Sequence, residues 1–387
     1  MARTYELISG DSHLDIPPER WVHHLPAEYR DRAPRTVRLP NGSDAQLIEN
    51  RPPLNVGLQL TAVPFEELGL RPVTYEDGPG TGPPEQRLRE QDQDGVEAEI
   101  LYTHPSQPNF WRGVKEDEVY RAIIHGYNEW LAEEYCAYAP DRLLAMGVLP
   151  DTGVDDAIEE MRFCVQAGLK GVCIYRFPNG KGYPLPEDDR FWAAAVELGV
   201  PLTAHTNGGT TRFVREGPVF KYPNDHAATP GRDPVSMAVR FASENAMAPL
   251  QLAFAGVYDR FPDLRIYWAE TQIGWLPYSF AQIDDNYERH RFWAKREWGL
   301  DPLERRPSEY LRDHALWGFM KDPFGVEVRH RMGVHSLIWG SDFAHPTGNW
   351  PHSRQVIEET FLEVSEDDKH LMLAGNVVDF FHLDGGA

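Results

Sequence analysis

The stretch Leu143–Val148 (LLAMGV) is a short apolar run. It is followed by an amphipathic segment from Val154 to Ala167 and by a second short run, Gly171–Tyr175 (GVCIY). In the middle segment Ile158 and Met161 recur at helical spacing. Strand, helix and strand in this order make a βαβ unit, because parallel strands need a crossover of a dozen or more residues. The stretch therefore predicts an α/β fold with a parallel sheet.

The same alternation continues along most of the chain. It yields eight candidate strands, which are Tyr5–Ser9, Ala98–Thr103, Leu143–Val148, Gly171–Tyr175, Leu202–His205, Arg265–Ala269, Ala315–Phe319 and Ser336–Gly340. Eight parallel strands are the number found in a TIM-type barrel. We predict a distorted TIM (β/α)8 barrel that takes up residues 1–387 as one domain.

Two segments interrupt this alternation. Residues 17–84 are rich in proline, glycine and polar side chains, and we predict a small N-terminal insertion here, called the cap segment below. Residues 208–234 form a second glycine- and proline-rich stretch after the fifth predicted strand. Loops of this length are usually functional, so Asn207 and His226 are predicted to belong to a lid.

Composition excludes several classes of partner. The chain carries 38 Lys and Arg against 60 Asp and Glu, a formal net charge of −22. A protein that neutralises phosphates needs a basic face, so nucleic acids are excluded and acidic membranes disfavoured. No run approaches the roughly 20 apolar residues that span a bilayer, and the first residues lack the apolar core of a signal peptide. We therefore expect a cytoplasmic protein. Its three cysteines lack the spacing of a zinc ribbon.

Residues able to bind a metal stand where several predicted strands end. Asp11 and His13 follow the first strand, and they project to the same side because strand side chains alternate. His205 ends the fifth strand, Glu270 the sixth and Asp342 the eighth. In a parallel barrel the active site lies at these carboxyl ends. The sequence therefore predicts that the five side chains meet at one end of the barrel.

Each of these residues also has an ordinary structural explanation when it is taken alone. A D-x-H pair recurs by chance, and His205 is equally typical of a hydrogen-bonded core histidine. Asp342 after Gly-Ser can cap a helix, and Glu270 can belong to a salt bridge. The conjunction of all five at equivalent strand ends favours a metal centre.

Two histidines together with carboxylates suit a divalent metal ion. We predict one such ion, held by four or five of these side chains, with zinc preferred and manganese or iron as alternatives. An open coordination position would lower the pKa of a bound water. The lack of candidate thiolate ligands argues against a purely structural zinc site.

Longer motifs carry a family resemblance. Leu198–His205 (LGVPLTAH), Gly256–Leu264 (GVYDRFPDL) and Trp339–Pro346 (WGSDFAHP) are specific when they occur in this order. With these motifs and Asp11–His13 (DSH), the chain resembles the amidohydrolase-related family of metal-dependent hydrolases and decarboxylases, of the aminocarboxymuconate-semialdehyde decarboxylase type. The resemblance covers nearly the whole chain. It implies a distorted TIM barrel, one divalent metal ion and a homodimer.

The resemblance assigns the family's metal ligands to Asp11, His13, His205 and Asp342, with two departures. The first ligand is commonly His or Glu in the characterised decarboxylases, whereas Asp11 has a shorter side chain. The sixth-strand histidine, which handles protons in those decarboxylases, is replaced by Glu270. A negative Glu270 near an anionic substrate is unfavourable unless burial raises its pKa.

These departures favour hydrolysis. We predict a metal-dependent hydrolase that acts on a small cyclic or aromatic substrate with a carbonyl group, through a metal-activated water. Asp342 would be the general base, and Glu270 or a nearby histidine would return the proton. A non-oxidative decarboxylase of an aromatic or unsaturated carboxylic acid is the alternative. A barrel that binds a small molecule without catalysis is the third hypothesis.

Further side chains at strand ends are predicted to act beside the metal. His345 is assigned to the catalytic group because it stands three residues after Asp342 and can orient that carboxylate or a water. His104, Arg176, Phe177 and Trp275 are predicted to bind substrate, although a turn, a surface arginine and core aromatics explain them equally well.

Overall fold

The computed structural model describes residues 3–55, 62–67, 70–76, 78–205 and 243–384. The loop predicted over residues 208–234, together with Asn207 and His226, lies outside the described residues. Within the described residues, no helix is long and apolar enough to cross a membrane.

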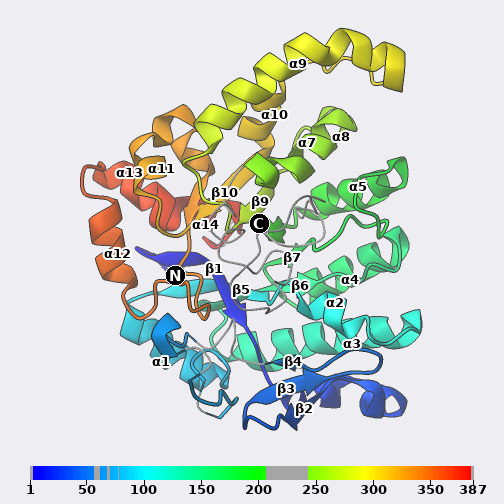
Figure 1. The fold of residues 1–387 in the computed structure, drawn as a ribbon, viewed down its shortest axis with the longest axis vertical. Helices are drawn as coiled ribbons and strands as arrows, with labels where there is room; N and C mark the ends of the chain where they lie inside the picture. The colour runs from blue at the N-terminus through cyan, green and yellow to red at the C-terminus, as the bar shows by residue number, and fades with distance from the viewer. Residues whose placement is uncertain (1–2, 56–61, 68–69, 77, 206–242, 385–387) are drawn as a thin grey trace, which may run out of the picture.

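Eight parallel strands form a nearly closed barrel, which confirms the predicted TIM-type fold (Figure 1). Each strand pairs with the next one along the chain. The strands are β1 Ile8–Leu14, β5 Ala98–Thr103, β6 Leu143–Val148, β7 Gly171–Cys173, β8 Leu202–His205, β9 Ile266–Ala269, β10 Ala315–Phe319 and β11 Leu337–Trp339. Four of them match the predicted ranges residue for residue, because each is an apolar run with clear ends.

The first strand differs from its prediction in a way that matters for the site. β1 begins at Ile8 and continues to Leu14, so Asp11 and His13 lie inside the strand and do not follow it. The register with β5 shifts between Ser9 and Ser12. The polar side chains in the second half of β1 are typical of a loop, so the sequence pattern did not indicate a strand there. Every residue of the strand is nevertheless buried.

The barrel closes where the chain beyond β11 returns to β1. Asp342 donates its backbone N–H to the carbonyl of Asp11 at 2.9 Å, and Ser12 forms an isolated parallel bridge with Phe343. A side chain on Gly340 would place its Cβ 2.7 Å from the Cβ of Asp11, closer than such atoms approach. Glycine at this position therefore lets the first and last strand ends come together.

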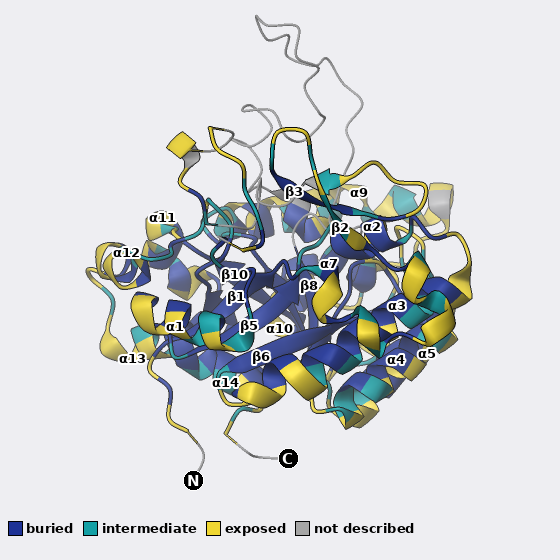
Figure 2. Ribbon diagram, turned by 90° about the horizontal axis from the view of Figure 1, so that it is seen from below, coloured by how far each residue is buried: buried dark blue, intermediate teal, exposed yellow. Residues whose placement is uncertain are grey.

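Helices wrap the outside of the barrel and bury only their inner faces, while the strands are buried throughout (Figure 2). The helices of the βα units and of the C-terminal part are α1 Pro84–Asp94, α2 Gln107–Trp111, α3 Asp117–Trp130, α4 Val154–Gln166, α5 Asp189–Leu198, α7 Met247–Phe254, α8 Val257–Arg260, α9 Leu276–Trp298, α10 Pro307–His314, α11 Pro323–Glu327, α12 Ser353–Thr360, α13 Glu366–His370 and α14 Asn376–Phe380.

The cap segment follows β1 and is built differently. It contains the short 3-10 helices η1 Pro18–Arg20, η2 Val22–His24, η3 Ala27–Arg32 and η4 Phe65–Glu67, and an antiparallel sheet of β2 Arg35–Arg38, β3 Asp44–Leu47 and β4 Leu54–Asn55. Short elements of this kind present little apolar surface, so the segment depends on the barrel for its packing.

Candidate metal centre and active site

Six titratable side chains gather at the carboxyl ends of the barrel strands, and we call them the central cluster. Asp11 and His13 come from β1, and His205 is the last residue of β8. Glu270 stands directly after β9, and Asp342 and His345 stand beyond β11. The central cluster is therefore Asp11, His13, His205, Glu270, Asp342 and His345.

Three donor atoms of the central cluster converge, and a fourth lies beside one of them. Oδ1 of Asp11 lies 3.4 Å from Nε2 of His13 and 3.4 Å from Nε2 of His205. Nε2 of His13 lies 3.1 Å from Oδ1 of Asp342. Ligands that share one ion at about 2.1 Å stand about 3.0–3.4 Å apart. Asp11, His13 and His205 thus have the spacing of ligands that share one divalent ion, and Asp342 stands next to this group through its contact with His13. Asp11 reaches the group despite its short side chain.

The central cluster is buried and poorly satisfied by hydrogen bonds. Asp342, His13 and His205 are fully buried, and Asp11 is nearly so. Within the described residues, neither carboxylate oxygen of Asp11 and neither ring nitrogen of His13 makes a hydrogen bond of acceptable geometry. Leaving buried polar atoms unpaired is costly, and a cation between them removes that cost. These residues therefore fit a bound metal ion better than a set of mutual hydrogen bonds.

The protonation states also suit metal binding. Burial, with a smaller contribution from His345, lowers the pKa of His13 to about 4. Burial alone would raise the pKa of Asp342, but the imidazoles of His345 and His13 hold that pKa below its usual range. At neutral pH His13 is a neutral imidazole and Asp342 a carboxylate, which are the forms that ligate metals.

Glu270 lies behind His205. Its Oε2 is 3.8 Å from Nδ1 of His205, whereas Nε2 of the same ring faces Asp11. This separation is longer than a hydrogen bond, so the carboxylate acts on the imidazole through its charge. This geometry suits an orienting role for Glu270 more directly than a proton transfer to substrate.

Two further histidines stand beside the ligands. Nδ1 of His345 lies 2.9 Å from Oδ1 of Asp342, and its ring stacks on His13 with centroids 4.2 Å apart. Within the described residues, Nε2 of His345 is buried and has no hydrogen-bond partner. The ring of His104 lies 5.7 Å from that of His345, and its Nδ1 is bonded to Ser106. The centre thus carries a histidine that can exchange a proton next to Asp342.

Left-handed backbone marks two of these strand ends. Glu270 and Asp342 both have φ of 58°, which non-glycine residues seldom adopt. Such strain costs about 1–3 kcal/mol and persists only where the surroundings impose it. It turns the chain sharply after β9 and after β11, and so brings both carboxylates to their histidines.

Arg87 is a buried residue beside the central cluster that sequence reasoning missed. Its guanidinium is buried and makes two hydrogen bonds to Glu99, at 2.6 and 3.2 Å. It also donates to the carbonyl oxygens of His13, at 2.9 Å, and Phe343, at 3.3 Å. Because these carbonyls belong to one predicted metal ligand and to the neighbour of another, Arg87 links β1 to the segment after β11. Its partners lie up to 256 residues away, so no local pattern signals it.

The structure places three predicted substrate residues elsewhere. Arg176 is exposed and pairs with Asp151 at 3.4 Å. Phe177 is buried in the hydrophobic core. Trp275 donates its indole N–H to the carbonyls of Thr271 and Gln272, which supports the turn after Glu270. His104 is the predicted substrate residue whose ring lies beside the central cluster, 6.4 Å from that of His13 and 5.7 Å from that of His345.

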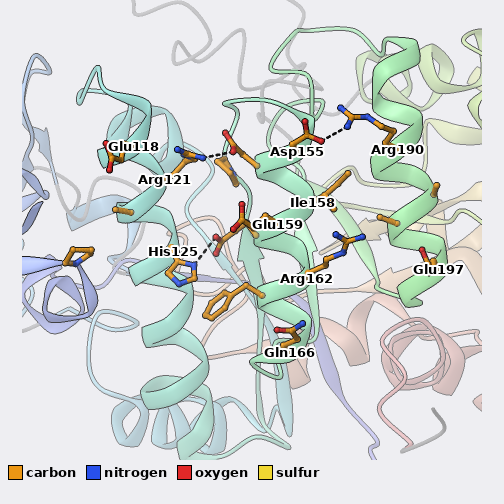
Figure 3. Close-up of a pocket in the computed structure, with 18 residues that line it drawn as sticks. Glu118, Arg121, His125, Asp155, Ile158, Glu159, Arg162, Gln166, Arg190 and Glu197 are labelled. Carbon is orange, nitrogen blue, oxygen red and sulfur yellow. Dashed lines mark hydrogen bonds and ion pairs between the residues drawn. The ribbon is translucent and has the colours of Figure 1, made fainter.

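A groove of about 1140 Å³ lies far from this chemistry, on the outside of the barrel. It runs over α4 between α3 and α5 (Figure 3). Some of its charged side chains form ion pairs, since Arg121 pairs with Asp156 at 2.6 Å and His125 with Glu160 at 3.1 Å. Among the residues that the structure describes, no group of histidine and carboxylate donors able to share a metal ion lines this groove.

Comparison with known proteins identifies the family. A family model described as Amidohydrolase matches residues 11–383. A 2-amino-3-carboxymuconate-6-semialdehyde decarboxylase of Dictyostelium discoideum is 23% identical over 305 residues, which are 78% of this chain and 77% of the relative. A gamma-resorcylate decarboxylase of Rhizobium sp. is 27% identical over 311 residues, which are 77% of this chain and 87% of the relative.

Solved structures share the fold. An amidohydrolase from Mycobacterium avium subsp. paratuberculosis aligns over 98% of this chain and 100% of its own, with a TM-score of 0.70 and 18% identity. A dihydroxybenzoic acid decarboxylase from Polaromonas sp. JS666 with bound manganese aligns over 99% of this chain and 98% of its own, with a TM-score of 0.62 and 19% identity.

These comparisons correct two predictions. The hydrolase prediction is wrong, because the relatives and several structural neighbours are decarboxylases. The preference for zinc is not supported, because the related structures that name a metal hold manganese. One divalent metal ion is supported by those structures and by the converging donors of the central cluster. The chain is an enzyme and belongs to the amidohydrolase family.

Proposed function

We propose that the protein is a metal-dependent, non-oxidative decarboxylase of a small aromatic or unsaturated carboxylic acid. The single observation that carries this proposal is the largely buried His345, which contacts Asp342 beside the predicted metal ligands. The names of the relatives, which are carboxy-lyases, support the reaction class.

Decarboxylation needs a proton donor at the carbon that loses carbon dioxide. The low pKa of Asp342 makes this carboxylate a poor donor. His345 is the better candidate, because histidine is the side chain most often used for general acid catalysis and, within the described residues, its buried Nε2 makes no hydrogen bond. Asp342, at 2.9 Å from Nδ1, stabilises the protonated ring.

The proposed reaction is a simple exchange. The bond between the carboxylate and the substrate carbon breaks, carbon dioxide leaves, and the electron pair remains on the substrate carbon. The proton held at Nε2 of His345 then forms the new C–H bond. The imidazole regains a proton from solvent at the mouth of the barrel, where the side chain of His345 is 11% exposed.

This assignment accounts for the departure at Glu270. The position that carries a proton-handling histidine in the characterised decarboxylases here holds a carboxylate 3.8 Å behind His205. We assign Glu270 the role of orienting His205, and we therefore assign the proton transfer to His345. The like charge of Glu270 is then separated from a substrate carboxylate by the His205 ring.

Asp11, His13, His205 and Asp342 would hold the metal ion, and we propose manganese as its identity. When bound, a divalent ion supplies positive charge that attracts substrate oxygens and stabilises negative charge developing on the substrate. The chain itself has a net charge of −22, so an anionic substrate depends on this local positive charge.

The test is carbon dioxide release from metal-loaded enzyme. A panel of hydroxybenzoates, 5-carboxyvanillate and 2-amino-3-carboxymuconate semialdehyde is incubated with the wild type and with His345→Gln and His352→Gln. We expect release from at least one acid, a loss of about 10²-fold or more in His345→Gln, and little change in His352→Gln, whose side chain is exposed.

In heavy water the product should carry one deuterium at the vacated carbon. Absence of release from every member of the panel would contradict the proposed substrate class. Unchanged release by His345→Gln would contradict the assignment of the proton donor, while leaving decarboxylation itself in place.

A further inference from the structure

A second group of histidines and carboxylates lies away from the active centre, where the cap segment meets the end of α3. His23 and His24 are the last residues of η2, Glu129 belongs to α3, and Glu134 belongs to the π-helical turn Leu131–Tyr135 that extends α3. We call His23, His24, Glu129 and Glu134 the surface cluster.

Two ring nitrogens of the surface cluster point at one oxygen. Nε2 of His23 lies 2.6 Å from Oε1 of Glu134, and Nε2 of His24 lies 2.9 Å from the same atom. The two rings stand 4.6 Å apart. Donor atoms of His23, His24 and Glu134 all lie within 4.8 Å of one another. This is the donor set of a two-histidine, one-carboxylate metal site.

The other ring nitrogen of His24 is hydrogen-bonded to a second carboxylate. Its Nδ1 lies 2.9 Å from Oε2 of Glu129. Metal-ligating histidines almost always donate their second N–H to a carboxylate, a carbonyl or a water. The Glu129–His24 pair therefore reproduces the carboxylate–histidine arrangement of metal sites, with Nε2 as the ligand atom.

The local fold builds this arrangement from both sides. In a regular α-helix, Glu129 and Glu134 would not share a face, but the i to i+5 bonding of the π turn brings residues five apart to one side. On α3, a Cβ at Gly126 would lie 3.3 Å from the backbone of His24 and 2.7 Å from Leu25, so glycine admits the close approach of η2. The side chain of His24 is only 10% exposed as a result.

We propose that His23, His24 and Glu134 form a second, surface site for a divalent ion of the zinc class, with Glu129 orienting His24. Two imidazole nitrogens favour zinc, copper or nickel over magnesium and calcium, which prefer oxygen ligands. A water completes the coordination. The ion joins the cap segment to the end of α3, so its effect is on the attachment of the cap segment and not on the chemistry in the barrel.

Binding exchanges protons for the ion. Without an ion, the hydrogen bonds to Glu134 require a proton on each facing nitrogen. The ion replaces these protons, so affinity rises with pH. The donor atoms need to separate only from 2.6–2.9 Å to about 3.0–3.4 Å, and the half-exposed side chains of His23 and Glu134 can make this adjustment.

The test counts metal on the full chain whose central site is loaded with manganese. Wild type, His23→Ala and His125→Gln are equilibrated with micromolar free Zn²⁺ at pH 7.5, and total Zn and Mn are measured by mass spectrometry. His125→Gln is the matched control, because His125 also lies on α3 and pairs with a single carboxylate, Glu160. We expect two metal equivalents per chain in wild type and His125→Gln, and one in His23→Ala.

Anomalous diffraction at the zinc edge should place the additional ion between His23 and Glu134. Equal metal content in wild type and His23→Ala, or an anomalous map without a peak at the surface cluster, would overturn the proposal and leave a hydrogen-bonded ion-pair network only. If His23→Ala fails to fold, Glu134→Gln replaces it, with the same expected loss of one equivalent.

Discussion

The central cluster and the surface cluster both consist of histidines and carboxylates, but their donor atoms are satisfied in different ways. Among Asp11, His13, His205 and Asp342 of the central cluster, the facing nitrogens and oxygens stand 3.1–3.4 Å apart, are buried, and make few hydrogen bonds within the described residues. In the surface cluster the equivalent distances are 2.6–2.9 Å and every facing pair is a hydrogen bond. The central donors depend on a cation, whereas the surface donors can also satisfy themselves with protons.

The two clusters also shift histidine pKa values in opposite directions. Burial lowers the pKa of His13 to about 4. For His24, partial burial acts to lower the pKa, but Glu129 and Glu134 outweigh it and raise the pKa. Chemical identity therefore does not decide the behaviour of a histidine–carboxylate group. The number of hydrogen bonds that the fold permits around such a group decides how it behaves.

The largest effect is expected from removing a central ligand. His13→Ala, His205→Ala and Asp342→Asn should each lose turnover by more than about 10³-fold, and the two histidine variants should also lose the bound metal. Metal content by mass spectrometry and turnover are measured on the same samples. Full activity in any of the three variants would refute the site.

Replacing Arg87 tests whether the arrangement of the predicted metal ligands depends on the residues that surround them. Arg87→Met leaves Glu99 buried without its partner and should lower the free energy of unfolding by about 3–5 kcal/mol. It should also weaken metal binding by about 10- to 100-fold, as losses around ligands typically do. Arg89→Met, an exposed change on the same helix, is the control. Loss of stability with unchanged metal affinity would make Arg87 merely structural.

The opposite pKa shifts predict opposite pH responses of the metal-free chain. Because the pKa of His13 is lowered from 6.5 to about 4, protonation favours the unfolded state. Stability present above pH 6.5 should therefore decrease by about 3 kcal/mol as the pH falls toward 4. Chemical denaturation at several pH values measures this slope, and His13→Asn should flatten it.

The contribution of His24 has the other sign. Its raised pKa adds stability below the unfolded pKa, and this is lost as the pH rises through the folded value. Proton NMR titration of the metal-free chain should show His24 still charged where His13 is neutral. If the rings of His13 and His24 titrated at the same pH, the predicted difference in pKa between the two clusters would be wrong.

The smallest effect is expected from the exposed member of the surface cluster. Without zinc, His23→Ala should change the free energy of unfolding by less than about 1 kcal/mol, because exposed ion pairs contribute little. With zinc in solution, the wild type alone should gain thermal stability, since the ion binds the folded chain. An equal gain in both proteins would place the zinc effect elsewhere.

The barrel and the position of its centre could be predicted from the sequence because both depend on local patterns. Ala98–Thr103 and Leu202–His205 are apolar runs whose ends mark the ends of the strands. Parallel strands direct these ends to one side, so His205 and Asp342 could be placed near each other although 136 residues separate them.

Features that depend on distant contacts could not be predicted. Arg87 reaches the carbonyl of Phe343, and His24 reaches Glu134, only because the fold brings these segments together. The same limit explains the wrong hydrolase prediction. It weighed the negative charge of Glu270 without knowing that this carboxylate lies behind His205 and that His345 stacks on His13.

The central claim is tested most directly by titrating metal-free enzyme with manganese while carbon dioxide release is followed. We predict that release rises in proportion to added manganese and stops rising at one equivalent bound to the central cluster. His205→Ala should remain inactive throughout this titration. Full release from metal-free enzyme, or an undiminished response in His205→Ala, would contradict the account.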